Sequence, residues 1–185
     1  MAIAPTTWTR RRALAGLGAV PFAAAATAAV PPEVTAELAA PRLHGQARFR
    51  YYGVHVYDIR LWVGAAFRRE ALDEMPLALE LEYARRLDGA AIAERSLAEM
   101  QRTVRIAPEQ ADRWLEAMRR VFPDVGRGDR LTGSHRPGQA ARFFHNGRSR
   151  GEVNDAAFAH AFFGIWLAPT SSAPELRRAL LGATP

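Results

Sequence analysis

Residues 44–64, HGQARFRYYGVHVYDIRLWVG, carry the pattern that decides the fold of this chain. Polar and apolar side chains alternate before and after Gly53, and successive side chains of a β-strand point to opposite faces of its sheet. A glycine between two alternating runs is typical of a tight turn. The stretch therefore predicts two strands that turn at Gly53 and share a sheet with one buried face and one partly wet face.

The same alternation assigns polar side chains to faces. Arg48 falls on the polar face of the first strand. On the second strand, Asp58 and Arg60 fall on the wetter face and Tyr57 on the other. Arg48 and Tyr57 lie on neighbouring strands, where a guanidinium and a phenol could together bind a carboxylate or phenolate. An arginine on a sheet face can equally be a surface residue whose stem covers apolar neighbours, and the residues alone leave both interpretations open.

After residue 64, segments with the two-residue period of a strand and segments with the 3.6-residue period of a helix follow one another. In 76–85, PLALELEYAR, leucines face one way and glutamates the other, and Asn146-Gly147 is a strong hairpin signal. The expected elements are strands over 44–64 and 76–85, helices over 88–104 and 108–123, strands over 128–138 and 141–153, and helices over 154–167 and 171–182. This order predicts an α+β domain in which an antiparallel sheet has helices packed on one side.

Several residues mark the expected helix ends. Asp88 and Asn154 are predicted N-caps of the helices that follow them. Ser172, with Glu175 three residues later, has the spacing of a capping box, and Gly182 is the predicted C-cap of the last helix.

The first 28 residues have the three-part build of a secretory signal. Residues 6–30, TTWTRRRALAGLGAVPFAAAATAAV, contain three arginines, an apolar run and then small residues with an A-x-A site at 26–28. TRRRAL approximates the twin-arginine pattern, and the ordinary secretion route stays open. An uncleaved anchor is the alternative, but this apolar run is shorter than the ~20 residues of a spanning helix. We expect a cleaved export signal over 1–28, a leader over 29–41, a single domain over 42–182, no stable membrane span after cleavage, and a periplasmic location.

Composition excludes several classes of function. Removal of residues 1–28 takes away three arginines and no acidic residue, which lowers the formal net charge from +6 to +3. No dense basic run remains, so nucleic acid is not an expected partner. The chain has no cysteine, which excludes disulfides, thiol nucleophiles and cysteine metal sites.

Motifs for metal or nucleophilic chemistry are also missing from the sequence. The five histidines do not occur at a metal-ligand spacing such as H-x-x-x-H with a nearby carboxylate. No serine lies in G-x-S-x-G, and VGRGD at 125–129 lacks the setting of a phosphate-binding loop. Trp114 and Trp166 fall on apolar helical stripes, where burial accounts for them. We therefore expect no metal, no other cofactor and no hydrolase triad.

Together, several motifs resemble the bacterial, exported branch of the chalcone isomerase-like family. G-x-A-R at 45–48 is followed by VYDIRLWV at 56–63, and FFGIWL at 162–167 is followed by ELRRALLG at 175–182. LELEYARRLDGAAIAERSLAEM and RFFHNG between them fit the same pattern. The resemblance covers residues 42–182 and implies an open-faced β-sandwich, in which a large antiparallel sheet carries a layer of helices on one face with a ligand cleft between them.

The resemblance also implies two kinds of function. In plant chalcone isomerases an arginine guides a phenolate in ring closure, while Thr, Tyr, Lys and Asn polarise the ketone; other members do no chemistry and bind fatty acids. Arg48 matches the arginine, and Tyr57 stands in place of the threonine. The region that would supply Tyr, Lys and Asn reads AIAERSLAEMQR and contains none of them. Because each lost donor typically costs about 10²- to 10³-fold in rate, efficient ring closure is not expected.

The leading hypothesis is a non-catalytic periplasmic protein that binds a small amphipathic ligand such as a fatty acid or aromatic acid. Arg48 would pair with the anionic head of this ligand, Tyr57 would assist, and apolar side chains would hold the tail. The alternatives are an isomerase, of the intramolecular lyase type, acting on an unknown substrate, and a structural or partner-binding envelope protein.

Overall fold

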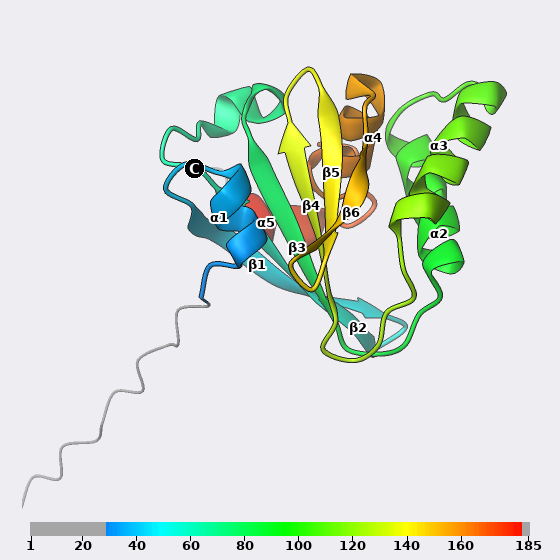
Figure 1. Cartoon of the computed structure of the whole chain (residues 1–185), viewed down its shortest axis with the longest axis horizontal. Coiled ribbons are helices and arrows are strands. Elements are labelled where there is room, and N and C mark those ends of the chain that lie inside the picture. The colour runs from blue at the N-terminus through cyan, green and yellow to red at the C-terminus, as the bar shows by residue number, and fades with distance from the viewer. Residues whose placement is uncertain (1–28, 183–185) are drawn as a thin grey trace, which may run out of the picture.

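The computed structural model describes residues 29–182, so the export signal predicted for 1–28 lies outside the described residues (Figure 1). In chain order the elements are α1 (Pro32–Glu37), β1 (Arg42–Tyr51), β2 (Val54–Val63), the 3-10 helix η1 (Arg69–Glu74), β3 (Leu77–Tyr83), α2 (Gly89–Thr103), α3 (Pro108–Val121), β4 (Arg130–Arg136), β5 (Ala140–His145), β6 (Arg148–Val153), α4 (Ala156–Leu167) and α5 (Pro174–Leu181).

A single antiparallel sheet of six strands, in the order β1-β2-β3-β4-β5-β6, organises the described part of the chain. Each strand pairs with the next one along the sequence. Residues of α2 to α5 share one hydrophobic core with one face of this sheet. This arrangement confirms the predicted α+β fold, an open-faced β-sandwich with a helical layer.

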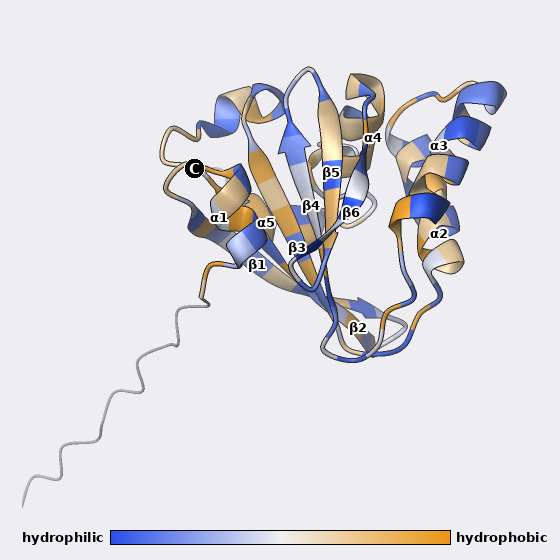
Figure 2. Ribbon diagram, in the orientation of Figure 1, coloured by the Kyte–Doolittle hydropathy of each residue, from blue (hydrophilic) through white to orange (hydrophobic). Residues whose placement is uncertain are grey.

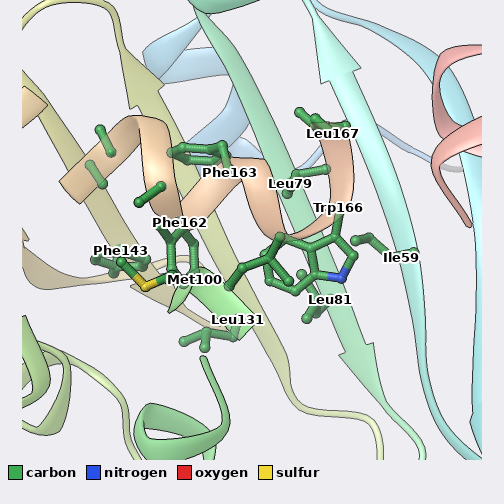
Figure 3. Close-up of a cluster of buried hydrophobic side chains, with 14 of the residues drawn as sticks. Ile59, Leu79, Leu81, Met100, Leu131, Phe143, Phe162, Phe163, Trp166 and Leu167 are labelled. Atoms are coloured by element: carbon green, nitrogen blue, oxygen red, sulfur yellow. The ribbon is translucent and has the colours of Figure 1, made fainter. Parts of the chain in front are cut away.

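The main core lies between the sheet and that helical layer. Leu79, Leu81 and Phe143 point from the strands into the core. Figure 3 shows Phe143 next to Phe162 of α4, and Leu79 and Leu81 next to Trp166 of the same helix. The rings of Phe143 and Phe162 meet edge to face with centroids 5.1 Å apart. Figure 2 shows apolar residues concentrated along β3, in the middle of the sheet. Because full burial of one such side chain stabilises a fold by about 1.5–3 kcal/mol, this core holds the helices on the sheet.

The segment 29–41, predicted as a leader, is in the structure part of the folded domain. It contains α1, and Val34 of this helix and Leu38 directly after it are buried against Trp62 and Ala78, apart from the main core. These two sheet residues belong to the face opposite to the helical layer, so α1 covers part of that second face. The prediction missed this helix because one short turn with two buried side chains carries almost no periodic signal.

The two hairpin turns predicted at Gly53 and at Asn146-Gly147 both form in the structure. Tyr52 and Gly53 join β1 to β2, and Asn146 and Gly147 join β5 to β6, all four with positive φ. Positive φ at both turn residues matches the twist of the strands on either side, and glycine adopts it without steric cost.

Two of the predicted helix caps are different in the structure. Asp155, rather than Asn154, caps α4, because its carboxylate accepts hydrogen bonds from the N–H groups of Ala157 and Phe158. Helix α5 begins at Pro174, and the hydroxyl of Ser172 makes no cap. That hydroxyl instead donates to Glu99 of α2 at 2.6 Å, a contact across 73 residues of sequence.

At α2, Asp88 holds the N-cap position but its side chain makes no capping hydrogen bond. The N–H of Gly89 donates instead to Asp124, in the loop before β4, at 2.9 Å. Gly182 ends α5 with a positive φ, as predicted.

Candidate functional site

A cavity of about 550 Å³ lies between the sheet and the helices α2, α4 and α5. Its wall is built mainly from apolar and aromatic side chains of β1, β2 and β3 on one side and of α2 and α4 on the other. Pockets that bind small molecules typically enclose about 300–1,000 Å³ and have mostly apolar walls with a few polar groups. The cavity has the size and lining of a site for an organic ligand.

Aromatic rings on β1, β2 and β3 form part of the sheet side of the cavity. Phe49 and Tyr57 are cross-strand partners, and their rings stack with centroids 4.9 Å apart. Tyr83 meets the ring of Tyr57 edge to face at 5.9 Å. The β1–β2 pairing is irregular after Phe49, and Val56 is left without a partner there. Because of this bulge, Val56 and Tyr57 both line the cavity although they are adjacent in sequence.

The hydroxyl of Tyr57 is fixed in the cavity wall. It accepts a hydrogen bond from the indole N–H of Trp166 at 3.1 Å, and Trp166 itself lines the cavity. No acceptor for the Tyr57 hydroxyl proton occurs among residues 29–182, so this proton can be donated to a ligand. Burial raises the pKa of Tyr57 to about 12, which keeps the phenol protonated at neutral pH.

A buried carboxylate, Glu99 of α2, marks the polar part of the cavity. One oxygen accepts the Ser172 hydroxyl at 2.6 Å and lies 3.8 Å from Nε of Arg102. The other oxygen lies 2.6 Å from a guanidinium nitrogen of Arg95, but no N–H within the described chain is aimed at it. Arg95, Glu99, Arg102 and Ser172 all line the cavity, so it holds two cations and one anion at this end.

Arg48 and Tyr57, the two predicted ligand residues, are not brought together. Arg48 pairs across the strands with Asp58, and its guanidinium donates to both oxygens of that carboxylate, at 2.7 and 3.2 Å. This hydrogen bonding lowers the pKa of Asp58 and raises that of Arg48. Arg48 is half exposed on the face away from the cavity, whereas Tyr57 lines the cavity. The structure therefore does not bring the two predicted ligand residues together: Tyr57 lies in the cavity wall and Arg48 lies outside it.

Arg95 and Glu99, which line the cavity, were not predicted as site residues. Both lie in AIAERSLAEMQR, the stretch of α2 that lacks Tyr, Lys and Asn. Their spacing of four residues places Arg95 and Glu99 on one side of a helix, and this spacing could have indicated that the two side chains lie together. The contribution of Ser172 had no signal in the sequence, because it depends on how α5 sits against α2.

Within residues 29–182, no group of three or more His, Asp or Glu side chains is arranged to hold a metal ion. In the same part of the chain, the helices fall short of the length and apolar character that a membrane crossing requires.

Comparison with known proteins agrees with this architecture. A protein of uncharacterised function from Haemophilus influenzae is 33% identical over 150 residues, which are 79% of this chain and 72% of that protein. The crystal structure of a fatty-acid binding protein from Arabidopsis thaliana superposes with a TM-score of 0.61 at 12% identity, covering 77% of this chain and 87% of that one. The sequence profile described as chalcone isomerase-like matches residues 23–182. By this match, the chain belongs to the chalcone isomerase-like family.

Proposed function

We propose that this protein binds a small amphipathic acid, such as a fatty acid, in the cavity between its sheet and helices, without chemical conversion. The observation that carries the proposal is the cavity of about 550 Å³, which is apolar along the strands and bears charged side chains on α2. An acyl chain or aromatic ring would bury its surface against Phe49, Leu81 and Trp166. Burial of apolar surface contributes about 25 cal/mol per Å², which makes the tail the main source of affinity.

The anionic head of such a ligand would lie beside α2. Arg95 and Arg102 outnumber Glu99 there, so the local charge favours an anion. Tyr57 adds a neutral O–H donor. Guanidinium groups bind carboxylates strongly because their N–H donors match the two oxygens in plane. The Arabidopsis protein of similar fold supports the proposal as far as its name goes, since that protein binds fatty acids.

The same residues argue against catalysis. The α2 stretch supplies Arg95, Ser96 and Glu99 to the cavity but no Tyr, Lys or Asn. A phenol with a pKa of about 12 is a poor general base near neutral pH.

We further propose that the protein works in the periplasm after removal of residues 1–28. The support is the signal pattern of those residues and the motifs at 45–63 and 162–182, which resemble the exported branch of the family. Mass determination of the protein recovered from cell fractions tests both parts. A full-length chain in the cytoplasmic fraction would contradict the proposal.

The test of ligand binding is mass spectrometry of the organic extract of the purified protein, compared between two variants. Ser96→Trp places a large ring in the cavity, whereas Ala98→Trp places the same ring on the exposed side of the same helix. A stoichiometric acid in the wild type and in Ala98→Trp, but not in a folded Ser96→Trp, is expected.

Two results would overturn this function. Extracts without any acid, together with no uptake of long-chain carboxylic acids in titration, would favour a structural or partner-binding role. Turnover of a chalcone that is lost in Ser96→Trp would instead show an isomerase.

A further inference from the structure

The turn between β1 and β2 exposes an unusual amount of apolar surface. Four large hydrophobic residues are exposed among residues 29–182, and three of them lie at this turn: Tyr51, Tyr52 and Val54, with 51%, 90% and 49% of their surface accessible. Single exposed apolar residues are common, but a cluster on one projecting turn marks a contact surface. We call Tyr51–Val54 the hairpin tip.

The backbone at the hairpin tip makes Tyr52 stand out further. Tyr52 and Gly53 have φ of 45° and 79°, almost the values of 49° and 81° at Asn146 and Gly147 in the β5–β6 turn. Asparagine is favoured at the first position of such a turn, and a bulky residue there is strained. The ring of Tyr52 contacts the ring of Tyr51, 4.6 Å away, and is otherwise open to solvent. Tyr52 therefore contributes little to the stability of the fold, and its backbone conformation is strained.

Arginines surround the hairpin tip on neighbouring loops. The loop after β3 carries Arg85 and Arg86, and the loop before β4 carries Arg127. The N–H of Ala84 donates to the carbonyl of Val56 on β2, close to the tip, and the N–H of Gly128 donates to the carbonyl of Tyr83 at the end of β3. Both loops therefore lie at the same end of the sheet as the tip, the lower end in Figure 1.

These three arginines are exposed, and within the described part of the chain none has a carboxylate partner. The acidic groups in the same loops are Asp88, Asp124 and Asp129. Asp124 and Asp129 each accept a backbone N–H inside the fold, so part of their charge is already satisfied. The guanidiniums remain available to an external anion.

The hairpin tip also borders the cavity. Tyr51, Val56 and Arg85 belong to the cavity wall, and the guanidinium of Arg95 lies 5.7 Å from the ring centre of Tyr51. An object that touches the tip would therefore lie next to the cavity opening.

We infer that the hairpin tip and its arginines dock onto the surface of a lipid bilayer with anionic headgroups, where the cavity ligand enters and leaves. Tyrosine side chains settle at the membrane interface, with the ring among the acyl chains and the hydroxyl in water. Arginine side chains pair with lipid phosphates. The passage of ligand rests on the proposed function, whereas the docking itself does not.

The test exploits the absence of cysteine from this chain. Tyr52→Cys, labelled with an environment-sensitive dye, reports insertion of the tip. Gln139→Cys, in the exposed β4–β5 turn at the other end of the sheet, is the matched control. Both labelled variants are mixed with vesicles of phosphatidylcholine alone or of phosphatidylcholine with added phosphatidylglycerol. Mass spectrometry first establishes that the two proteins begin at the same residue. We expect the dye emission to shift to the blue only when the dye is at position 52 and only when the vesicles contain phosphatidylglycerol.

Unlabelled variants separate charge from aromatic contact. Arg86→Gln and Arg127→Gln, which lie outside the cavity wall, should each weaken vesicle binding about fivefold, the effect of roughly 1 kcal/mol per arginine. Tyr52→Asn should weaken vesicle binding while its melting temperature stays equal or rises, because asparagine suits this turn.

Equal dye responses at positions 52 and 139, or no response at position 52, would overturn the docking. Capture of the tip by a protein without any response to vesicles would overturn it too. Acid extracted from the cavity with no vesicle response would leave the proposed function standing, whereas vesicle docking with an empty cavity would reject that function alone.

Discussion

Arg95→Gln should weaken the binding of a long-chain carboxylic acid, and Arg48→Gln should not. Both substitutions remove one positive charge, but Arg95 lines the cavity and Arg48 lies on the opposite face of the sheet. Two unit charges 4 Å apart interact by about 1 kcal/mol in water and about 4 kcal/mol near a protein surface. Because the Arg95 side chain is 58% exposed, we take a value near the lower end, about 1.4 kcal/mol. The expected loss is about tenfold in Kd.

Displacement of a fluorescent fatty acid measures this difference directly. Thermal melting of each variant checks its fold, and loss of the exposed Arg48–Asp58 pair should change the melting temperature little. Glu99→Gln provides the opposite change, because it removes the anion beside Arg95 and should increase affinity. If Arg95→Gln leaves Kd unchanged and Arg48→Gln raises it, the reasoning is refuted and the acid binds on the outer face of the sheet.

Three further predictions concern stability. Val34→Ala should cost about 2 kcal/mol in chemical denaturation, and Val30→Ala almost nothing, because Val34 of α1 is fully buried and Val30 is exposed; equal costs would show that α1 is not part of the domain. Gly45→Ala should cost about 3 kcal/mol, since a Cβ at this position would overlap backbone carbonyls of α5; a wild-type melting temperature would contradict that packing. Burial raises the pKa of Tyr57 from 10.0 to about 12 and also raises the pKa of Tyr83, so both phenols bind protons more tightly in the folded state. Their contribution to stability is complete below pH 10 and is lost as the pH rises through 12, which denaturation at stepped alkaline pH would measure; a Tyr57→Phe variant with the same pH profile as the wild type would argue against Tyr57 as the source.

The order of the elements could be predicted from the sequence because it depends on local periods. The alternation in 44–64 and 76–85 and the helical stripes that follow produce the observed sheet and helical layer. The Asn146-Gly147 turn has a local cause as well, since these residues adopt positive φ most readily.

The composition of the site could not be predicted in the same way. Alternation places Arg48 on the polar side of its strand and Tyr57 on the less polar side of the next strand, but it does not say which residues lie opposite each other. That depends on the register, and a shift of one residue moves every side chain to the other face. The unpaired Val56 changes that register within β2, and nothing local marks it. The sequence therefore left Arg48 as a candidate partner of Tyr57.

The sequence by itself determined the fold class, the turns at Gly53 and Asn146-Gly147, and the absence of cysteine and lysine. Only the tertiary structure decided that Arg48 pairs with Asp58 away from the cavity, that α1 belongs to the domain, and that Arg95, Glu99 and Ser172 meet in one cavity. The physical reason is the distance along the chain over which each interaction acts. Periodicity and turn geometry act between residues a few positions apart, whereas a cavity is the space left between elements that are distant in the chain, and its volume depends on how all their side chains pack.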